Sequence, residues 1–149
     1  MDNRVALPGY KVYEEPDGTR PAAAIAFLDL EPARGTAVNG GLLPVDKDAL
    51  AALDTRERQY RRVEVSEDID PPPAAGDGPV WTYVGRDAGR RRVADGRRGA
   101  GVVLVQRAYV DLVEAAFARL GDDALRDYRA STEPPPFAVA ELARIDLPA

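Results

Sequence analysis

The sequence predicts a protein of the α+β class, folded as a single domain over residues 1–149. Two observations support this. Short β-rich segments separated by turn signals fill the first half of the chain, and an amphipathic helical pattern dominates the second half. Hydrophobic residues make up 45% of the chain, which suits one modest core, and 149 residues leave no room for two ordinary domains.

Five segments are predicted as strands. Residues 9–13 end at a Pro-Asp-Gly turn, and residues 23–30 form an apolar run whose alanines make it ambiguous with a helix. Residues 36–43 follow a turn at Gly35 and end before Pro44. Residues 60–65 and 80–84 are β-rich, and we expect them to pair across the proline- and glycine-rich loop at 70–78.

Helices are predicted at residues 46–58 and in the second half. Asp46 is a suitable N-cap, and Asp48 lies in the first turn, where the helix dipole favours an acidic residue. The apolar residues between 109 and 120 form one continuous stripe, which Gly121 ends. A second helix then runs from 122 to about 130. Residues 137–147 are expected to be a tail that packs on the body of the domain.

An arginine-rich segment spans residues 86–99, with six arginines against two aspartates. In proteins, an arginine-rich run of this kind is more often a solvated, mobile loop than a binding site. The alternative is that one of its guanidinium groups binds the carboxylate of a small substrate, a task that suits the planar geometry of arginine.

Composition excludes several classes of chemistry. The chain has no histidine and no cysteine, which removes imidazole bases, cysteine nucleophiles, disulfides and His/Cys metal sites, and we expect no metal ligands. A net charge of −5 argues against a nucleic-acid or anionic-membrane binder. The chain shows neither a signal-peptide pattern nor an apolar run of transmembrane length, so we expect a cytoplasmic protein.

Glu57 is the carboxylate with the strongest claim to chemistry. It lies four residues after Leu53 and seven after Leu50, so it continues the apolar face of the predicted helix 46–58. Burial and the negative end of the helix dipole both disfavour an ionised carboxylate there, which suits a general acid/base. The alternative is that the helix end frays and Glu57 extends into water. Asp54 lies off this face and has a weaker claim, as a capping or structural residue.

Several segments in order resemble one known family. LDTRE at 53–57 followed by YRRVEV at 60–65 is similar to the LD-x-x-E…Y-x-x-V-x-V signature of γ-glutamylcyclotransferase-like (AIG2-like) proteins. LPGY at 7–10, GTAVNG at 35–40, the helix entry at 44–50 and VWTYV at 80–84 resemble the segments around that signature. The resemblance covers about residues 7–85. It implies a mixed sheet or small barrel with flanking helices.

The resemblance also implies an activity. Family members release 5-oxoproline from γ-glutamyl amino acids or amines, because the α-amine of the substrate attacks its own γ-carbonyl. The reaction needs no metal or organic cofactor, and the molecule that the protein binds is a small γ-glutamyl substrate. By resemblance, Glu57 is the general acid/base and Tyr60 supplies a substrate-binding hydroxyl. For Tyr60, a cross-strand packing role is the alternative.

The sequence departs from the family at one point. Members open with a strand carrying a Y-G-S-N or Y-G-T-L segment, and no Tyr-Gly pair occurs here. Three explanations are open: a start internal to a longer product, a strand supplied by a partner chain, or lost activity. A missing strand would expose a sheet edge, which favours a homo-oligomer. The alternative function is therefore a catalytically inactive binding or assembly module with the same fold.

Overall fold

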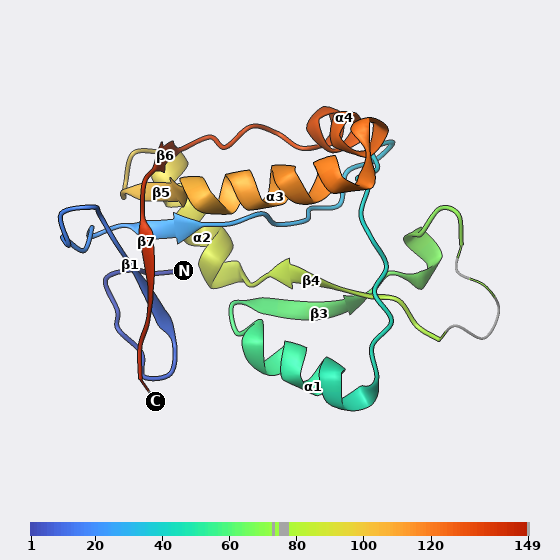
Figure 1. Ribbon diagram of the computed structural model, residues 1–149, viewed down its shortest axis with the longest axis horizontal. Helices are drawn as coiled ribbons and strands as arrows, with labels where there is room; N and C mark the ends of the chain where they lie inside the picture. Colours follow the sequence, from blue (N-terminus) through green and yellow to red (C-terminus); the bar gives the residue numbers. More distant parts are fainter. Residues whose placement is uncertain (73, 75–77, 149) are drawn as a thin grey trace. The chain divides into compact units, whose positions relative to one another are not determined.

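The computed structural model describes residues 1–72, 74 and 78–148, and it is an α+β structure, as the sequence predicts (Figure 1). The helices and strands, in chain order, are β1 Lys11–Glu14, β2 Ala24–Ala26, α1 Lys47–Arg56, β3 Tyr60–Glu64, the 3₁₀ turn η1 Ser66–Asp68, β4 Trp81–Gly85, α2 Asp87–Arg97, β5 Val103–Gln106, α3 Arg107–Leu120, α4 Asp122–Ser131, β6 Ala138–Ala140 and β7 Ala143–Asp146.

The strands form three small sheets rather than one continuous sheet. Their orders are β1–β7, β2–β5–β6 and β3–β4, and none of them closes into a barrel within the part of the chain that the structure describes. Backbone proximity divides the chain into two compact units. The first comprises Met1–Phe27, Ala33–Gly41 and Arg91–Ala149, and the second comprises Leu28–Pro32 and Leu42–Arg90.

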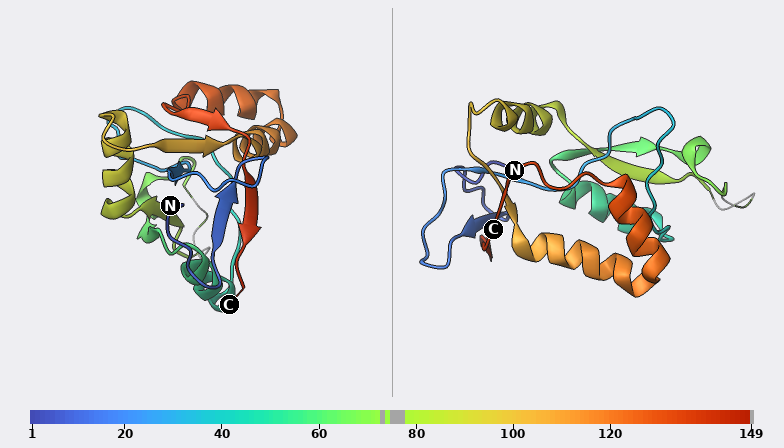
Figure 2. Two further views of the ribbon diagram at one scale, coloured as in Figure 1. Left: turned by 90° about the vertical axis from the view of Figure 1, so that its left-hand side faces the viewer. Right: turned by 90° about the horizontal axis from the view of Figure 1, so that it is seen from above.

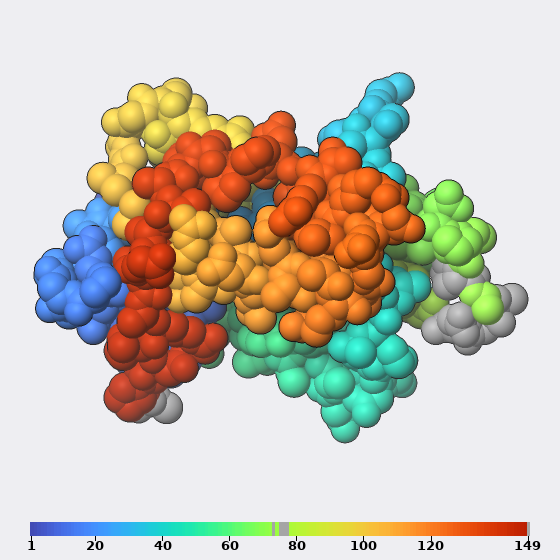
Figure 3. Space-filling view, turned by 45° about the horizontal axis from the view of Figure 1, so that its top comes forward, coloured from blue at the N-terminus to red at the C-terminus, as the bar shows by residue number. Residues whose placement is uncertain are grey.

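The first unit contains the main cluster of buried hydrophobic residues. β5 pairs in parallel with β2 on one side and with β6 on the other, and α3 and α4 form the crossover that parallel pairing of β5 with β6 requires. Antiparallel β1 and β7 pair residue by residue, with Val12 opposite Ile145. Tyr13, Ile25 and Leu142 form the centre of the core. Figure 2 shows α3 and α4 as a bent helical pair, and their outer surface is visible in Figure 3.

Helices α3 and α4 confirm the helical pattern of the second half. Gly121, at φ 114°, separates the two helices, in a backbone region that favours glycine. The rings of Phe117 on α3 and Tyr128 on α4 stack with centroids 4.4 Å apart. The apolar stripe on α3 therefore continues into an aromatic contact with the next helix.

The second unit contains α1, the β3–β4 hairpin and the segment 28–32. α1 begins where the sequence predicts, because the Asp46 side chain accepts a hydrogen bond from the backbone N–H of Ala49 at 2.8 Å. β3 and β4 pair antiparallel, as predicted, with Arg62 opposite Tyr83. The loop that joins them lies in part outside the described residues.

Two predicted elements are wrong and a third is too long. The arginine-rich segment is not a loop: it forms α2, in which arginine and alanine are good helix formers, and positive-φ Gly99 follows its end. Residues 36–43 form no strand, and the exposed Leu42 and Leu43 show that the apolar run is not buried. β2 covers only three residues of the predicted 23–30.

The C-terminal tail packs on the body of the first unit, as expected, but it does so as strands. β6 extends the parallel sheet and β7 pairs with β1. The side-chain amide of Gln106 donates to the carbonyl of Leu142 at 2.8 Å, which ties the end of β5 to the segment between the two C-terminal strands.

Candidate functional site

Glu57 lies where the sequence places it, on the less exposed face of α1. Leu50, Leu53 and Glu57 are half-buried, whereas the other residues between Lys47 and Arg56 are exposed. The Glu57 side chain is 24% exposed. The apolar face of the helix therefore continues into a carboxylate at its C-cap position.

The backbone of Glu57 is held on both sides. Its N–H donates to the carbonyl of Leu53 at 2.8 Å, which closes the last turn of α1, and its own carbonyl accepts the N–H of Tyr60 at 2.9 Å. The helix does not fray before Glu57, because both bonds are made. Only two residues, Arg58 and Gln59, separate Glu57 from the first residue of β3.

The Glu57 carboxylate pairs with its chain neighbour. Oε1 accepts a hydrogen bond from Nε of Arg56 at 2.8 Å and also lies 2.8 Å from an η-nitrogen of the same guanidinium. Within the described residues, the structure gives Oε2 no hydrogen-bond partner. Since the Arg56 side chain is 71% exposed, this ion pair contributes little to stability. The pair involves only Oε1, so Oε2 is left to act as a proton acceptor.

Tyr60 is close to Glu57 in the chain, and its hydroxyl has a structural partner. The hydroxyl donates to the carbonyl of Leu28 at 3.2 Å, so the first residue of β3 contacts the segment 28–32. The backbone carbonyl of Tyr60 accepts a hydrogen bond from Nε of Arg86 at 2.9 Å. The substrate-binding role of Tyr60 stays a prediction.

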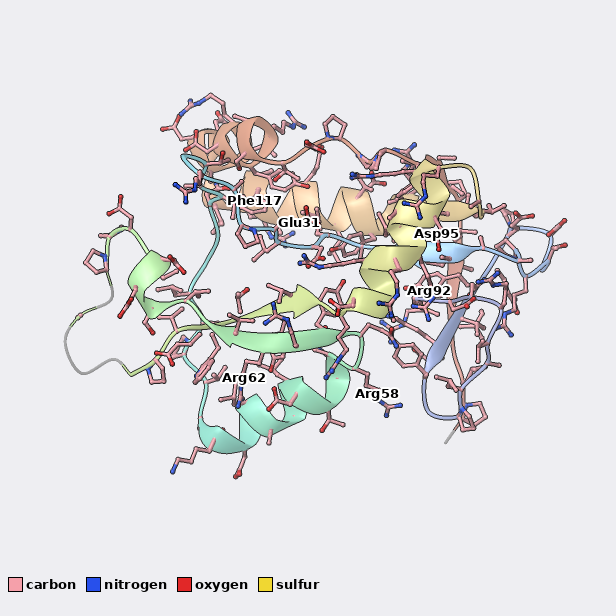
Figure 4. The ribbon with its side chains drawn as sticks, turned by 180° about the vertical axis from the view of Figure 1, so that it is seen from behind. Glu31, Arg58, Arg62, Arg92, Asp95 and Phe117 are labelled. Carbon is pink, nitrogen blue, oxygen red and sulfur yellow. The ribbon has the colours of Figure 1, made fainter. Side chains whose placement is uncertain are left out.

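The sequence did not indicate a side-chain network that surrounds Asp54. Tyr83 of β4 donates its hydroxyl proton to Oδ1 of Asp54 at 2.8 Å, and Arg62 of β3 lies 3.0 Å from Oδ2. The Arg62 guanidinium also lies over the Trp81 ring, 4.8 Å from its centroid. Figure 4 shows Arg62 on the side of the hairpin next to α1. The cross-strand positions of Arg62 and Tyr83 were a signal that could have indicated the network.

Tyr83 is electrostatically perturbed by these surroundings. Loss of solvent contact raises the pKa of its phenol, and the hydrogen bond to the Asp54 carboxylate raises that pKa further. The raised pKa keeps the phenol protonated near pH 7, so it is the donor in its hydrogen bond with Asp54.

A second network holds the segment 28–32 against the end of β4. Oδ1 of Asp29 accepts the N–H of Gly85 at 2.6 Å, and Oδ2 lies 3.1 Å from Nε of Arg90. Arg90 also donates to the carbonyl of Leu30 at 2.7 Å. Arg90, one of the arginines that were candidates for a substrate carboxylate, thus has structural partners, and a side chain at position 85 would require the Asp29 carboxylate to shift.

Neither a metal site nor a membrane span is present among the residues that the structure describes. No group of three or more acidic side chains there is arranged to hold a metal ion. No helix in the same residues has the length and apolar character needed to cross a bilayer.

Comparison with known families assigns the class of protein. The profile described as "Gamma-glutamyl cyclotransferase, AIG2-like" matches residues 2–98, about two thirds of the chain. The chain therefore belongs to the AIG2-like γ-glutamyl cyclotransferase family, which confirms the resemblance seen in the LDTRE segment and its neighbours. No curated protein and no solved structure gives a significant match. The matched range includes α1, the β3–β4 hairpin and Glu57.

Proposed function

We propose that this protein releases 5-oxoproline from a γ-glutamyl amino acid or amine, with Glu57 as the general acid/base. The observation that carries the proposal is the position of Glu57. It is the glutamate of the LD-x-x-E segment within the matched range, and it continues the half-buried face of α1 with one carboxylate oxygen unengaged by the described residues.

The reaction is an intramolecular acyl transfer. The α-amine of the substrate attacks the γ-carbonyl carbon and closes a five-membered lactam, and the bond between that carbon and the leaving nitrogen breaks. Glu57 removes one proton from the α-ammonium group before the attack and returns it to the leaving nitrogen as the bond to carbon breaks. The second proton that the ring nitrogen must lose passes by way of Glu57 to the released amine. The products are 5-oxoproline and an ammonium ion, so the protons balance and the carboxylate is regenerated.

Positioning supplies much of the rate in such a ring closure, because the nucleophile and the electrophile belong to one molecule. A single carboxylate held at a fixed place beside the α-amine then suffices for proton transfer. The connection between α1 and β3 supports this role, since the backbone of Glu57 is hydrogen-bonded to Leu53 before it and to Tyr60 after it.

The test measures 5-oxoproline release from a panel of γ-glutamyl amino acids and γ-glutamyl amines by chromatography. We expect Glu57→Gln to lower kcat by roughly 10²- to 10⁴-fold, the usual contribution of a general acid/base. Glu67→Gln in the exposed turn η1 is the matched control and should retain the parent rate. Full activity in Glu57→Gln would refute the site assignment. No turnover by the parent with any substrate would instead support a binding or assembly module.

A further inference from the structure

Asp54 lies in the same helical turn as the proposed base, and both of its carboxylate oxygens are engaged. Oδ1 accepts the Tyr83 hydroxyl at 2.8 Å, and Oδ2 lies 3.0 Å from the Arg62 guanidinium. A carboxylate whose two oxygens are both engaged by protein groups is a poor candidate for proton transfer to a substrate. Its contacts indicate a different task.

The two partners of Asp54 come from different strands. Arg62 of β3 and Tyr83 of β4 are directly opposite each other in the hairpin, so their side chains leave the same face of the two strands. Both reach one carboxylate on α1. The last turn of the helix is thus connected to both strands of the hairpin through a single residue.

The Arg62 side chain is ordered by a third group. Its guanidinium lies over the ring of Trp81, 4.8 Å from the centroid, while it pairs with Asp54. A contact with an aromatic face restricts the guanidinium and so reduces the entropy lost on forming the ion pair. The hairpin therefore presents a pre-arranged pair of donors to the Asp54 carboxylate.

Glu57 lacks side-chain restraints of this kind. Within the part of the chain that the structure describes, its carboxylate pairs only with the exposed Arg56 of its own helix end. Its location depends on where the last turn of α1 lies, and Asp54 is the residue of that turn that contacts the hairpin by side-chain hydrogen bond and ion pair.

We infer that Asp54 is a positioning residue for Glu57: through Tyr83 and Arg62 it fixes the end of α1 on the β3–β4 hairpin and thereby sets the location of the Glu57 carboxylate. This inference rests on the proposed function for its catalytic consequence, but its structural half is measurable without any substrate. An error of about 1 Å in the placement of a reacting group costs on the order of 10²-fold in rate.

The structural test is amide hydrogen exchange, resolved by residue with NMR. Asp54→Ala should accelerate exchange of the Glu57 and Tyr60 N–H groups by roughly tenfold or more, because both bonds depend on the anchored turn. Asp48→Ala, in the exposed first turn of the same helix, is the matched control and should leave these two amides unchanged. Unchanged exchange in Asp54→Ala would overturn the inference.

The kinetic test separates positioning from substrate binding. Asp54→Ala should lower kcat by roughly 10- to 100-fold with KM changed less than about twofold. Asp54→Asn keeps a carbonyl oxygen for the Tyr83 hydroxyl and should recover part of kcat, and Tyr83→Phe should lose a similar part. Tyr128→Phe on α4 is the matched control for removal of a phenol hydroxyl. An equal loss in Asp54→Asn and Asp54→Ala would overturn the claim that the Tyr83 bond carries the effect.

The two proposals fail in different ways. An inactive parent contradicts the proposed reaction, and the exchange of the Glu57 amide then decides the positioning of α1 by itself. An active parent whose Glu57→Gln variant is inactive, together with a fully active Asp54→Ala variant, supports the reaction and refutes the positioning residue. If Asp54→Ala does not fold, Tyr83→Phe serves for both measurements, because it removes one hydroxyl and leaves the ring.

Discussion

The side-chain amide of Asn3 pairs with both backbone groups of Tyr13. Its Oδ1 accepts the Tyr13 N–H at 2.8 Å and its Nδ2 donates to the Tyr13 carbonyl at 2.8 Å, so the amide takes the place of a neighbouring strand. Nδ2 also donates to the carbonyl of Pro21 at 3.2 Å. Asn3 has no exposed surface, and Tyr13 is 2% exposed, so these bonds are made in the core of the first unit.

Replacing Asn3 should therefore destabilise the fold. Asn3→Ala leaves the Tyr13 N–H and carbonyl buried without partners, and we expect the free energy of unfolding to fall by about 2–4 kcal/mol. Asn39→Ala is the comparator and should cost less, because in the part of the chain that the structure describes the Asn39 side chain makes one hydrogen bond, from Nδ2 to the carbonyl of Ala124, and its Oδ1 has no partner. Urea unfolding followed by circular dichroism measures both. Equal losses in the two variants would contradict a special role for Asn3.

Two glycines of α2 should respond in opposite directions to alanine. A methyl group at Gly96 would overlap the Val103 side chain and press on the Phe137 ring, whereas one at Gly89 would meet nothing within 4 Å. We expect Gly96→Ala to lower the free energy of unfolding by about 1–3 kcal/mol through overpacking. Gly89→Ala should raise it by about 0.5–1 kcal/mol through helix propensity. Thermal unfolding of the two variants checks the signs, and a stabilising Gly96→Ala would refute the packing argument.

The ion pair between Glu114 on α3 and Arg129 on α4 should make stability depend on acid pH. The hydrogen bond from Arg129, 2.8 Å long, lowers the pKa of the Glu114 carboxyl below its ordinary value. A lowered pKa in the folded state means a contribution that is present above the ordinary carboxyl pKa and is lost as pH falls through the lowered value.

The Tm difference between the parent and Glu114→Gln should therefore shrink as the pH is lowered from about 7 to about 3. Asp111→Asn, an exposed residue of the same helix, is the control, and its Tm difference should vary less with pH. A Tm difference for Glu114→Gln that stays constant over this range would show that the ion pair does not contribute. High salt should also reduce the difference, because the pair is exposed.

The pKa of the Tyr83 phenol should lie above the ordinary value for tyrosine. Desolvation is the larger cause and the hydrogen bond to Asp54 the next, so Asp54→Ala should lower the pKa of Tyr83 only part of the way to the ordinary value. The measurement is the ultraviolet difference titration of each protein against its Tyr83→Phe counterpart. A Tyr83 titration that is unaffected by Asp54→Ala would contradict the hydrogen bond.

The arginine-rich segment was predicted to be a loop and forms the helix α2, which shows how local composition can mislead. A run of arginines with few apolar residues suggests a solvated loop, yet Arg90 donates to the carbonyls of Gly85 and Leu30 and pairs with Asp29. These partners lie 5, 60 and 61 positions away in the chain. Arginine and alanine favour the helix locally, and the contacts of Arg90 with Asp29 and Leu30 add tertiary support that no local pattern contains.

Elements that depend on short-range chemistry were predictable from the sequence alone. The N-cap at Asp46, the hairpin of β3 and β4, and the place of Glu57 after Leu53 follow from capping, β-propensity and helical periodicity. The family signature in LDTRE is likewise a local property. The sequence by itself therefore determined the α+β class, the family and the residue proposed as the base.

Tertiary structure alone decided which side chains meet. Asp54 contacts Tyr83 across 29 positions, the Asp29 carboxylate approaches the backbone of Gly85 across 56, and the C-terminal β7 pairs with β1. The physical reason is that a carboxylate or a strand edge could pair with many chemically equivalent groups elsewhere in the chain. The periodicity of the sequence does not distinguish between these possible partners. Packing of the whole chain selects one, so Asp54 meets Tyr83 and Arg62, whereas the Glu57 carboxylate pairs with Arg56.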